Sequence, residues 1–197
     1  MIQGDGIEYE KLAEWVKTLP IYSESPREII TCEIGVREGL GSKIIMDEIA
    51  ARFPGVRYKH IAIDPYGNLK YQHYDTGTKD TVDFPVRADY TNKMRDEMIK
   101  DFVRYPEFKF HNMTDTEFMN KHPNIGPFDL VFFDGPHMSK DVMTEAIWFA
   151  NRSRRGTRFI FDDHSHYEMS IISYALTIYG FETIECGENK ICLERKK

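Results

Sequence analysis

Carboxylate side chains stand at the end of each apolar run that the sequence predicts as an inner strand of a sheet. Glu33, Asp64 and Asp134 occupy such positions, and the pair Asp162-Asp163 follows the last run. A carboxylate beside buried surface is costly unless a cation or a hydrogen-bond donor pairs with it. In open α/β sheets, ligands bind outside the carboxyl ends of the strands. The repetition at four strand ends therefore predicts an acidic crevice that binds a ligand.

The turn after the first of these strands contains glycines between Glu33 and Lys43, and glycine lets a backbone turn tightly and approach a ligand closely. The turn fits neither the G-x-x-x-x-G-K-[ST] nor the G-x-G-x-x-G phosphate motif. Glu33 would repel a pyrophosphate and attract a cation, while Asp64 is placed to accept hydrogen bonds from ribose hydroxyls. The turn therefore favours an adenosine-type ligand that carries a sulfonium and an ammonium group and no phosphate.

Apolar runs alternate with amphipathic segments along the chain, which is typical of right-handed βαβ units. The predicted fold is α/β: a Rossmann-like, doubly wound, mainly parallel seven-stranded sheet with an antiparallel C-terminal hairpin strand at one edge. Strands are predicted at 29–34, 58–63, 106–112, 128–133, 157–161, 181–186 and 190–194, and helices at 8–19, 40–53, 139–151 and 166–179.

The stretch 65–90 is irregular and rich in Tyr, Asp, Gly and Thr. Loops of this length in a compact domain are usually functional or disordered. Because it follows the second predicted strand, we expect it to form a lid or substrate loop over the crevice. The length of 197 residues fits one domain, which we expect to span residues 1–197.

Two short segments, Thr114–Glu117 and Ser165–Glu168, fit the S/T-x-x-E capping box that starts helices. If Ser165 is the N-cap of a helix, Asp162 and Asp163 are not needed as caps and are available to a ligand.

The composition is that of a globular protein, with 41% hydrophobic and 29% charged residues. The formal net charge of −6 opposes a general nucleic-acid surface, because that affinity depends on Lys and Arg neutralising phosphates. No apolar run approaches the roughly 18 residues of a membrane helix. The N-terminus lacks a signal-peptide pattern, and Cys32, Cys186 and Cys192 suit a reducing compartment in which each is a buried thiol. We therefore expect a cytoplasmic protein without a membrane partner.

Three motifs in this order point to a known group of enzymes. The turn Glu33-x-Gly35-x-x-x-Gly39, together with Asp64, resembles the cofactor turn of class I S-adenosylmethionine-dependent methyltransferases. The segments 128–137 and 159–163 are similar to those of a metal-associated O-methyltransferase group, which includes catechol O-methyltransferase and macrolide and antibiotic-sugar O-methyltransferases. The element order matches over residues 29–195, and the three motifs together are much more specific than the first alone.

The resemblance implies roles for residues on the cofactor side. Glu33, Gly35 and Gly39 would lie near the methionine part of S-adenosylmethionine, and Asp64 would hold its ribose. The segment Met113-Thr114-Asp115 would lie beside the adenine.

The resemblance also implies a divalent metal, expected to be Mg²⁺, bound by Asp134, Asp162 and Asp163. Carboxylate oxygens are ligands that Mg²⁺ prefers, and the ion keeps open positions for water and substrate. Asp134 would in addition contact the cofactor and take part in catalysis. His137 stands where the catechol enzyme's motif has its catalytic lysine, and histidine is a competent base near neutral pH.

The resemblance thus implies an S-adenosylmethionine-dependent methyltransferase that O-methylates a small-molecule hydroxyl with help from a metal. The metal would lower the pKa of the hydroxyl, and His137, or else His164, would remove its proton. Simpler interpretations stay open: Asp64-Pro65 and Asp134-Gly135 could be turns, and Asp162-Asp163 could only complement a helix dipole.

Other functions also stay open. The alternatives are a non-catalytic cofactor-binding scaffold, a nicotinamide-dependent oxidoreductase, which Glu33 and the glycine spacing oppose, and a methyltransferase acting on nucleic acid, which the net charge opposes. Some relatives of the metal-associated group are hydroxylases. A homo-oligomer is possible through the N-terminal helix, Trp15 or the edge hairpin.

Overall fold

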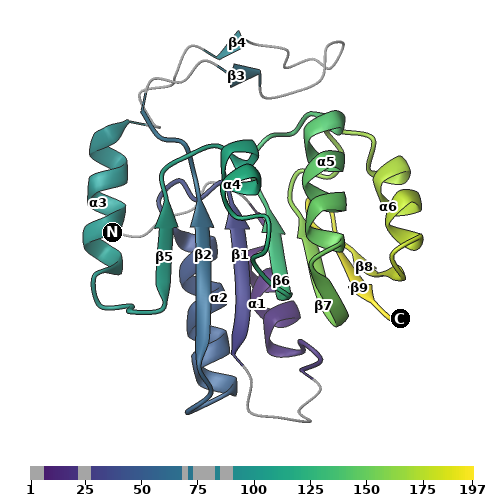
Figure 1. Cartoon of the computed structure of the whole chain (residues 1–197), viewed down its shortest axis with the longest axis horizontal. Helices are drawn as coiled ribbons and strands as arrows, with labels where there is room; N and C mark the ends of the chain where they lie inside the picture. The colour runs from purple at the N-terminus through teal and green to yellow at the C-terminus, as the bar shows by residue number, and fades with distance from the viewer. Residues whose placement is uncertain (1–6, 22–27, 68–70, 73–82, 85–90) are drawn as a thin grey trace.

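A seven-stranded sheet runs through the centre of the computed structural model, which describes residues 7–21, 28–67, 71–72, 83–84 and 91–197 (Figure 1). Its strand order is β5-β2-β1-β6-β7-β9-β8. The first five of these strands are parallel, and β9 is antiparallel to both β7 and β8. The predicted fold class, including the antiparallel hairpin at one edge, is confirmed. The strands are β1 (Ile29–Ile34), β2 (Tyr58–Ile63), β5 (Phe108–His111), β6 (Phe128–Phe133), β7 (Ser153–Phe161), β8 (Phe181–Cys186) and β9 (Ile191–Arg195).

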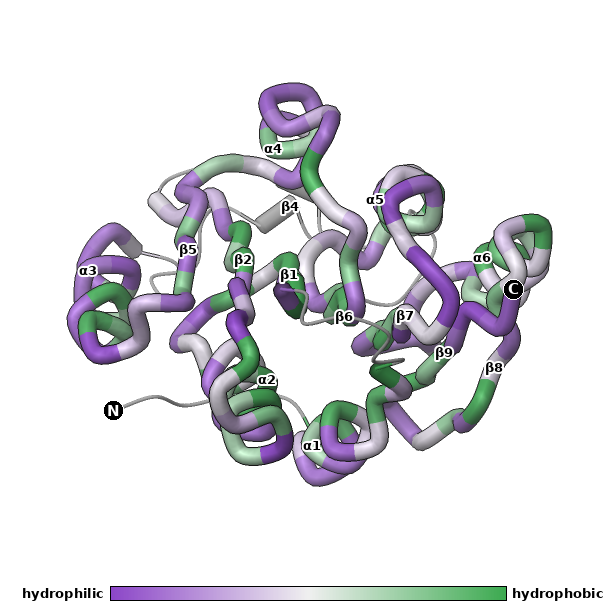
Figure 2. Tube along the Cα trace, turned by 60° about the horizontal axis from the view of Figure 1, so that its bottom comes forward, coloured by the Kyte–Doolittle hydropathy of each residue, from purple (hydrophilic) through white to green (hydrophobic). Residues whose placement is uncertain are grey.

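Helices cover both faces of this sheet (Figures 1 and 2). On one face, α1 (Tyr9–Lys17) and α2 (Leu40–Arg52) bury their apolar sides against β1, β6 and β7. On the other face, α4 (Asp115–Lys121), α5 (Ser139–Ala150) and α6 (Met169–Thr177) pack against an aromatic-rich core. Among the described helices, none is long and apolar enough to cross a membrane.

Every residue of β6 is buried, as expected for a parallel strand covered on both faces. Asp129 is the charged exception within it. The Arg154 side chain donates to both Asp129 carboxylate oxygens, at 2.9 and 2.6 Å, and the Ile30 backbone N–H donates to the same group at 3.0 Å. Arg154, one of three arginines in the segment 152–155, therefore forms an ion pair with a buried strand residue.

The two capping-box predictions have opposite outcomes. Thr114 and Glu117 form both halves of the box at the start of α4. The second prediction is wrong, because α6 begins at Met169 and Glu168, its N-cap, makes no side-chain capping bond. Asp163 has a left-handed φ of 49°, and the His166 N–H donates to the Asp163 carbonyl at 2.8 Å, so the chain makes a separate tight turn before the helix.

The segment between β2 and α3 (Asn92–Phe102) is described only in part. Within it, β3 (Tyr71–Gln72) and β4 (Asp83–Phe84) pair antiparallel beyond the carboxyl ends of the parallel strands (Figure 1). Most of 65–90 lies outside the described residues, so the lid stays a prediction. The sequence did not predict α3, which starts where Thr91 Oγ1 accepts from the Met94 N–H at 3.2 Å.

Two further expectations need correction. Trp15, suggested as part of an association surface, is buried, and its indole N–H donates to Glu185 at 2.8 Å. Cys32 and Cys192 are buried as predicted, but Cys186 is exposed on the edge strand β8.

Candidate functional site

The parallel register brings the predicted acidic residues to one edge of the sheet. Backbone pairing continues one residue beyond the strands: the Asp64 N–H donates to His111 O at 3.2 Å, Asp134 to Ile34 O at 2.8 Å and Asp162 to Phe133 O at 2.9 Å. Glu33 is the last but one residue of β1. The four residues therefore follow the strand order β2-β1-β6-β7 along the crevice edge.

Asp64 organises the turn after β1. Its Oδ2 accepts hydrogen bonds from the backbone N–H groups of Val36, at 2.8 Å, and Arg37, at 3.1 Å. Its side chain is 4% exposed, and burial raises the pKa of Asp64 to about 6, against the lowering effect of the two N–H groups. The carboxylate thus has a structural role on Oδ2 beside any role toward a ribose.

Two glycines in this turn have left-handed φ angles that other residues adopt only with strain. Gly35 has φ 82°, and a Cβ there would overlap the backbone carbonyl of Asp134. Gly39 has φ 86° and caps α2, and a Cβ there would overlap the Phe102 ring. The first glycine is therefore required for β1 and β6 to end side by side.

Glu33 is 1% exposed and ends a buried hydrogen-bond chain. The Thr31 hydroxyl lies 2.8 Å from His60 Nδ1, His60 Nε2 lies 2.9 Å from Ser42 Oγ, and Ser42 Oγ donates to Glu33 Oε2. Because Ser42 Oγ donates to Glu33, it accepts from His60 Nε2, which therefore carries a hydrogen. This series of hydrogen bonds holds the Glu33 carboxylate in one orientation near the carboxyl end of β1.

Asp134 and Asp162 form a carboxyl pair within hydrogen-bonding reach of each other. Burial, followed by the neighbouring Asp162, raises the pKa of Asp134 well above its usual range. Burial also raises the pKa of Asp162, but Lys190 opposes the shift. The Lys190 ammonium donates to Asp162 Oδ1 at 2.7 Å, and the Asn189 side-chain amide donates to the same oxygen at 2.6 Å.

His137 lies beside this pair and is 4% exposed. Its Nδ1 is 3.7 Å from Asp163 Oδ2, and its ring stacks on Tyr167 with the ring centroids 6.0 Å apart. The Tyr167 hydroxyl donates to the Asp162 carbonyl at 2.8 Å. His164, the other histidine considered as a base, instead has Nε2 3.2 Å from the Gly187 carbonyl in the hairpin turn. The structure thus pairs His137, and not His164, with a crevice carboxylate.

The three predicted metal ligands do not converge on one point. Within the described part of the chain, no group of three or more His, Cys, Asp or Glu side chains is arranged to hold a metal ion. Asp162 Oδ1 already accepts from an ammonium and an amide, and Asp163 faces His137. The residues in this arrangement do not fit a three-aspartate site, so Mg²⁺ stays a prediction and no step below involves it.

The segment predicted beside the adenine leads into α4. Thr114 uses its hydroxyl as the helix cap, accepting from the Glu117 N–H at 3.1 Å, and Met113 packs against the aromatic core. Glu145 of α5 lies near Asp115, and neither of its buried carboxylate oxygens has a hydrogen-bond partner among the described residues. It is 1% exposed, and burial, followed by Asp115, raises its pKa well above the usual range.

Lys190 and Glu145 are the site residues that sequence reasoning missed. The sequence suggested the turn before Lys190 only as a hairpin connection and Glu145 only as part of a helix. No local pattern distinguishes a buried lysine or glutamate from the exposed ones that surround them, because burial depends on which strands and helices come together.

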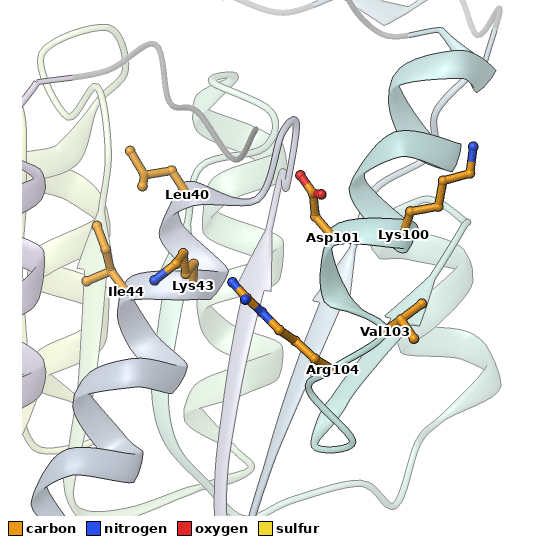
Figure 3. Close-up of a pocket in the computed structure, with 7 residues that line it drawn as sticks. All are labelled: Leu40, Lys43, Ile44, Lys100, Asp101, Val103 and Arg104. Carbon is orange, nitrogen blue, oxygen red and sulfur yellow. The ribbon is translucent and has the colours of Figure 1, made fainter.

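A separate groove of about 710 Å³ lies between the start of α2 and the end of α3 (Figure 3). No predicted site residue lines it, and its Lys43 ammonium already pairs with Asp47 of the same helix. It is not part of the candidate site. Its lining residues are Leu40, Lys43, Ile44, Lys100, Asp101, Val103 and Arg104.

A family model described as a methyltransferase domain matches residues 32–164, which include the predicted turn, the carboxyl pair and His137. A comparison with curated proteins found no match.

Several solved structures share the fold. The calicheamicin methyltransferase CalS11 has a TM-score of 0.60 at 11% identity, over 94% of this chain and 76% of that one. The O-methyltransferase NovP has a TM-score of 0.60 at 14% identity, over 95% and 79%. MycE, a methyltransferase of mycinamycin biosynthesis solved with Mg and S-adenosylhomocysteine, has 0.54 at 13%, over 95% and 47%. An rRNA methylase from Streptococcus thermophilus also matches, with 0.54 at 12%, over 95% and 96%.

Proposed function

The chain belongs to the methyltransferase domain family, and from that premise we propose that it transfers the methyl group of S-adenosylmethionine to a hydroxyl oxygen of a small molecule. The observation that carries the cofactor assignment is the buried acidic turn. Within the described residues, the hydrogen-bond donors to Glu33 and Asp64 are the Ser42 hydroxyl and two backbone N–H groups, and none is a lysine or arginine side chain. Such a turn favours a cationic ligand and repels a phosphate.

The residues at the carboxyl edge fit this cofactor. Glu33, Gly35 and Gly39 would hold the methionine part, and Asp64 would hold the ribose. Asp64 Oδ2 already accepts from two backbone N–H groups, so a ribose hydroxyl would donate to the remaining capacity of the carboxylate. When bound, the cofactor supplies a methyl group on a positively charged sulfur, which an oxygen nucleophile can accept.

The adenine would lie beside Met113 and Thr114, with Asp134 at the boundary between cofactor and acceptor. Buried carboxyl groups there suit the exocyclic amino group of adenine, which is a hydrogen-bond donor. The buried Glu145 carboxyl, whose oxygens have no hydrogen-bond partner among the described residues, lies near Asp115 of this segment and supports the assignment.

His137 would act as the base toward the acceptor. Its imidazole accepts the hydroxyl proton as the oxygen forms its bond to carbon, and the sulfur takes the electron pair of the broken carbon–sulfur bond. The Asp163 carboxylate, 3.7 Å from Nδ1, would stabilise the imidazolium that results. Most of the acceleration would come from holding the acceptor oxygen in line with the methyl group.

The acceptor is proposed to be a small molecule, because the net charge of −6 opposes a nucleic-acid surface. The CalS11, NovP and MycE folds support this class. An RNA acceptor is the second candidate, because an rRNA methylase shares the fold over nearly its whole length.

Calorimetric titration with S-adenosylmethionine and S-adenosylhomocysteine tests the cofactor assignment. We expect micromolar binding of both by the wild type and at least about tenfold weaker binding by Glu33→Gln, because the carboxylate would lose its charge in a buried site. Glu48→Gln is the matched control, since Glu48 of α2 pairs with Lys17 of α1, away from the acidic turn. Absence of binding to the wild type would overturn the proposal.

Transfer of a labelled methyl group tests the acceptor and the base. Hydroxyl-bearing small molecules and RNA are compared as acceptors. Transfer to RNA alone would show that the acceptor is RNA and not a small molecule, while the proposed methyl transfer from S-adenosylmethionine would stand. His137→Gln should lower kcat by about 10²- to 10⁴-fold, whereas His164→Gln should leave it within about threefold. The reverse result would assign the base to His164.

A further inference from the structure

Lys190 is fully buried at the end of the turn between β8 and β9, in contact with Asp162 of the carboxyl pair. Its ammonium donates to Asp162 Oδ1 at 2.7 Å and to the Ile7 carbonyl at 2.7 Å. The same ammonium lies 4.8 Å from the centre of the Tyr9 ring and 5.7 Å from that of Phe132. A buried ammonium is stable only when an opposite charge and hydrogen-bond acceptors compensate for the lost water. Lys190 has both, so it forms a buried ion pair with Asp162.

The hairpin turn that carries Lys190 is itself held in place. The Glu8 carboxylate accepts from the backbone N–H groups of Glu188, Asn189 and Lys190 at 3.1, 2.8 and 2.9 Å. Glu8 has a left-handed φ of 61°, which the three bonds compensate. Glu8 and Glu188 are 180 residues apart in sequence. Two distant segments of the chain therefore fix the ammonium against Asp162.

The oxygen that faces Lys190 has no capacity left for a further cation. Asp162 Oδ1 accepts from the Lys190 ammonium, the Asn189 amide and the Asp163 backbone N–H, the last at 3.0 Å. Asp134 and Asp162 meet at this point, and a negative charge on such a buried pair requires a nearby positive charge. The protein supplies that charge from its own side chain.

We propose that Lys190 is a resident cation that neutralises the Asp134–Asp162 pair in place of a divalent metal. The inference rests on the proposed methyl transfer, and it assigns Lys190 a positioning role: it holds Asp162, and through it Asp134, at the boundary between cofactor and acceptor. Proton removal then falls to His137 and not to a metal-bound hydroxyl. The reaction should proceed equally in Mg²⁺ and in EDTA.

Binding of Mn²⁺ alone, measured by electron paramagnetic resonance on the full chain, tests this assignment. Lys190→Gln keeps a hydrogen-bond donor and removes the charge, which leaves the two carboxylates to an external cation. We expect the variant to bind Mn²⁺ at least about tenfold more tightly than the wild type. Lys190→Arg, which keeps the charge, should not gain affinity. Lys196→Gln should not gain affinity either, because the partly exposed Lys196 ammonium pairs with Glu194 and not with the Asp134–Asp162 pair.

Equal or weaker Mn²⁺ binding by Lys190→Gln would overturn the proposal, because a lysine that merely oriented a metal ligand would lose metal affinity on substitution. If Lys190→Gln does not fold, the wild type decides: millimolar Mg²⁺ should leave its thermal unfolding temperature unchanged, whereas a native metal site would raise it by mass action. Titration of the same proteins with S-adenosylhomocysteine tests the proposed function separately. If none of these proteins binds S-adenosylhomocysteine, the proposed function is refuted. The role of Lys190 is then decided by the Mn²⁺ affinities alone.

Discussion

The two halves of the acidic sheet edge hold their carboxylates by different physical means. On the β2–β1 side, Asp64 and Glu33 are held by neutral donors: two backbone N–H groups and the Ser42 hydroxyl. On the β6–β7 side, Asp134 and Asp162 lie beside the buried ammonium of Lys190. Neutral donors orient a carboxylate and leave its charge to attract a ligand, whereas an ammonium cancels that charge. The first half therefore suits recognition of a cationic cofactor. The second half suits a rigid boundary of the site, in which the charge of the carboxyl pair is neutralised by a side chain of the protein.

The largest effect should come from a substitution where the two halves meet, between the ends of β1 and β6. Gly35→Ala should lower the free energy of unfolding by about 4 kcal/mol, because the new Cβ adds left-handed strain and overlaps the Asp134 carbonyl. Urea denaturation measures the change. Gly55→Ala is the matched control, since Gly55 has φ 81° but nothing within 4 Å of a Cβ, and it should cost only about 1 kcal/mol.

Removing the ammonium should affect stability on the β6–β7 side. Lys190→Met should cost about 3 kcal/mol, because Asp162 would stay buried without its partner. Adding Asp162→Asn should recover part of the loss, which a double-mutant cycle of urea midpoints would reveal. Lys196→Met removes a partly exposed ammonium from Glu194, which Arg158 also holds at 3.0 Å, and should stay within about 0.5 kcal/mol. Equal losses at the two lysines would contradict the buried pair.

The neutral-donor half should respond more weakly. Ser42→Ala should cost about 2 kcal/mol, because it leaves both Glu33 and His60 without their shared partner. Thr144→Ala, which removes an exposed hydroxyl bonded to its own helix, should stay within about 0.5 kcal/mol. Chemical denaturation of both variants gives the comparison, and a neutral Ser42→Ala would show that the chain does not orient Glu33.

The smallest effect should appear in the pH dependence of cofactor binding. Asp64 has a pKa of about 6, raised from 3.8, so below pH 6 the free protein carries a proton there that a ribose-binding carboxylate must lose. Affinity for S-adenosylhomocysteine should therefore rise with pH, by up to about tenfold per unit below 6, and level off above it. Calorimetric titration between pH 5 and about pH 8 measures the trend, and Asp64→Asn should flatten it.

The same raised pKa affects folding with the opposite sign. Between 3.8 and about 6 the folded Asp64 binds more protons than the unfolded one, so its contribution to stability falls as pH rises through this window. Stability and cofactor affinity should thus change in opposite directions with pH. Parallel changes would indicate that Asp64 does not contact the cofactor.

The sequence predicted the elements that local patterns encode. The mainly apolar runs predicted β1, β2 and β6 at the residues observed, since buried parallel strands need side chains that pack on both faces. It did not predict α3, whose polar sequence buries only Met98 and Phe102. It placed the start of α6 at 166 instead of Met169, because the tight turn at Asp163 is not distinguishable locally from a capping box.

Glu33, Asp64, Asp134 and Asp162 were placed at one edge by the sequence alone, because a parallel sheet brings the residues after its strands together whatever the rest of the chain does. What each carboxylate meets there was decided only by the tertiary structure. The hairpin turn and the N-terminal segment, 180 residues apart, place Lys190 against Asp162, while Asp163 turns toward His137. The positions of the strands in the sequence follow from local pattern, but charge pairing is a contact between distant segments. The acidic edge of the sheet could therefore be predicted from the sequence, and its internal cation could not.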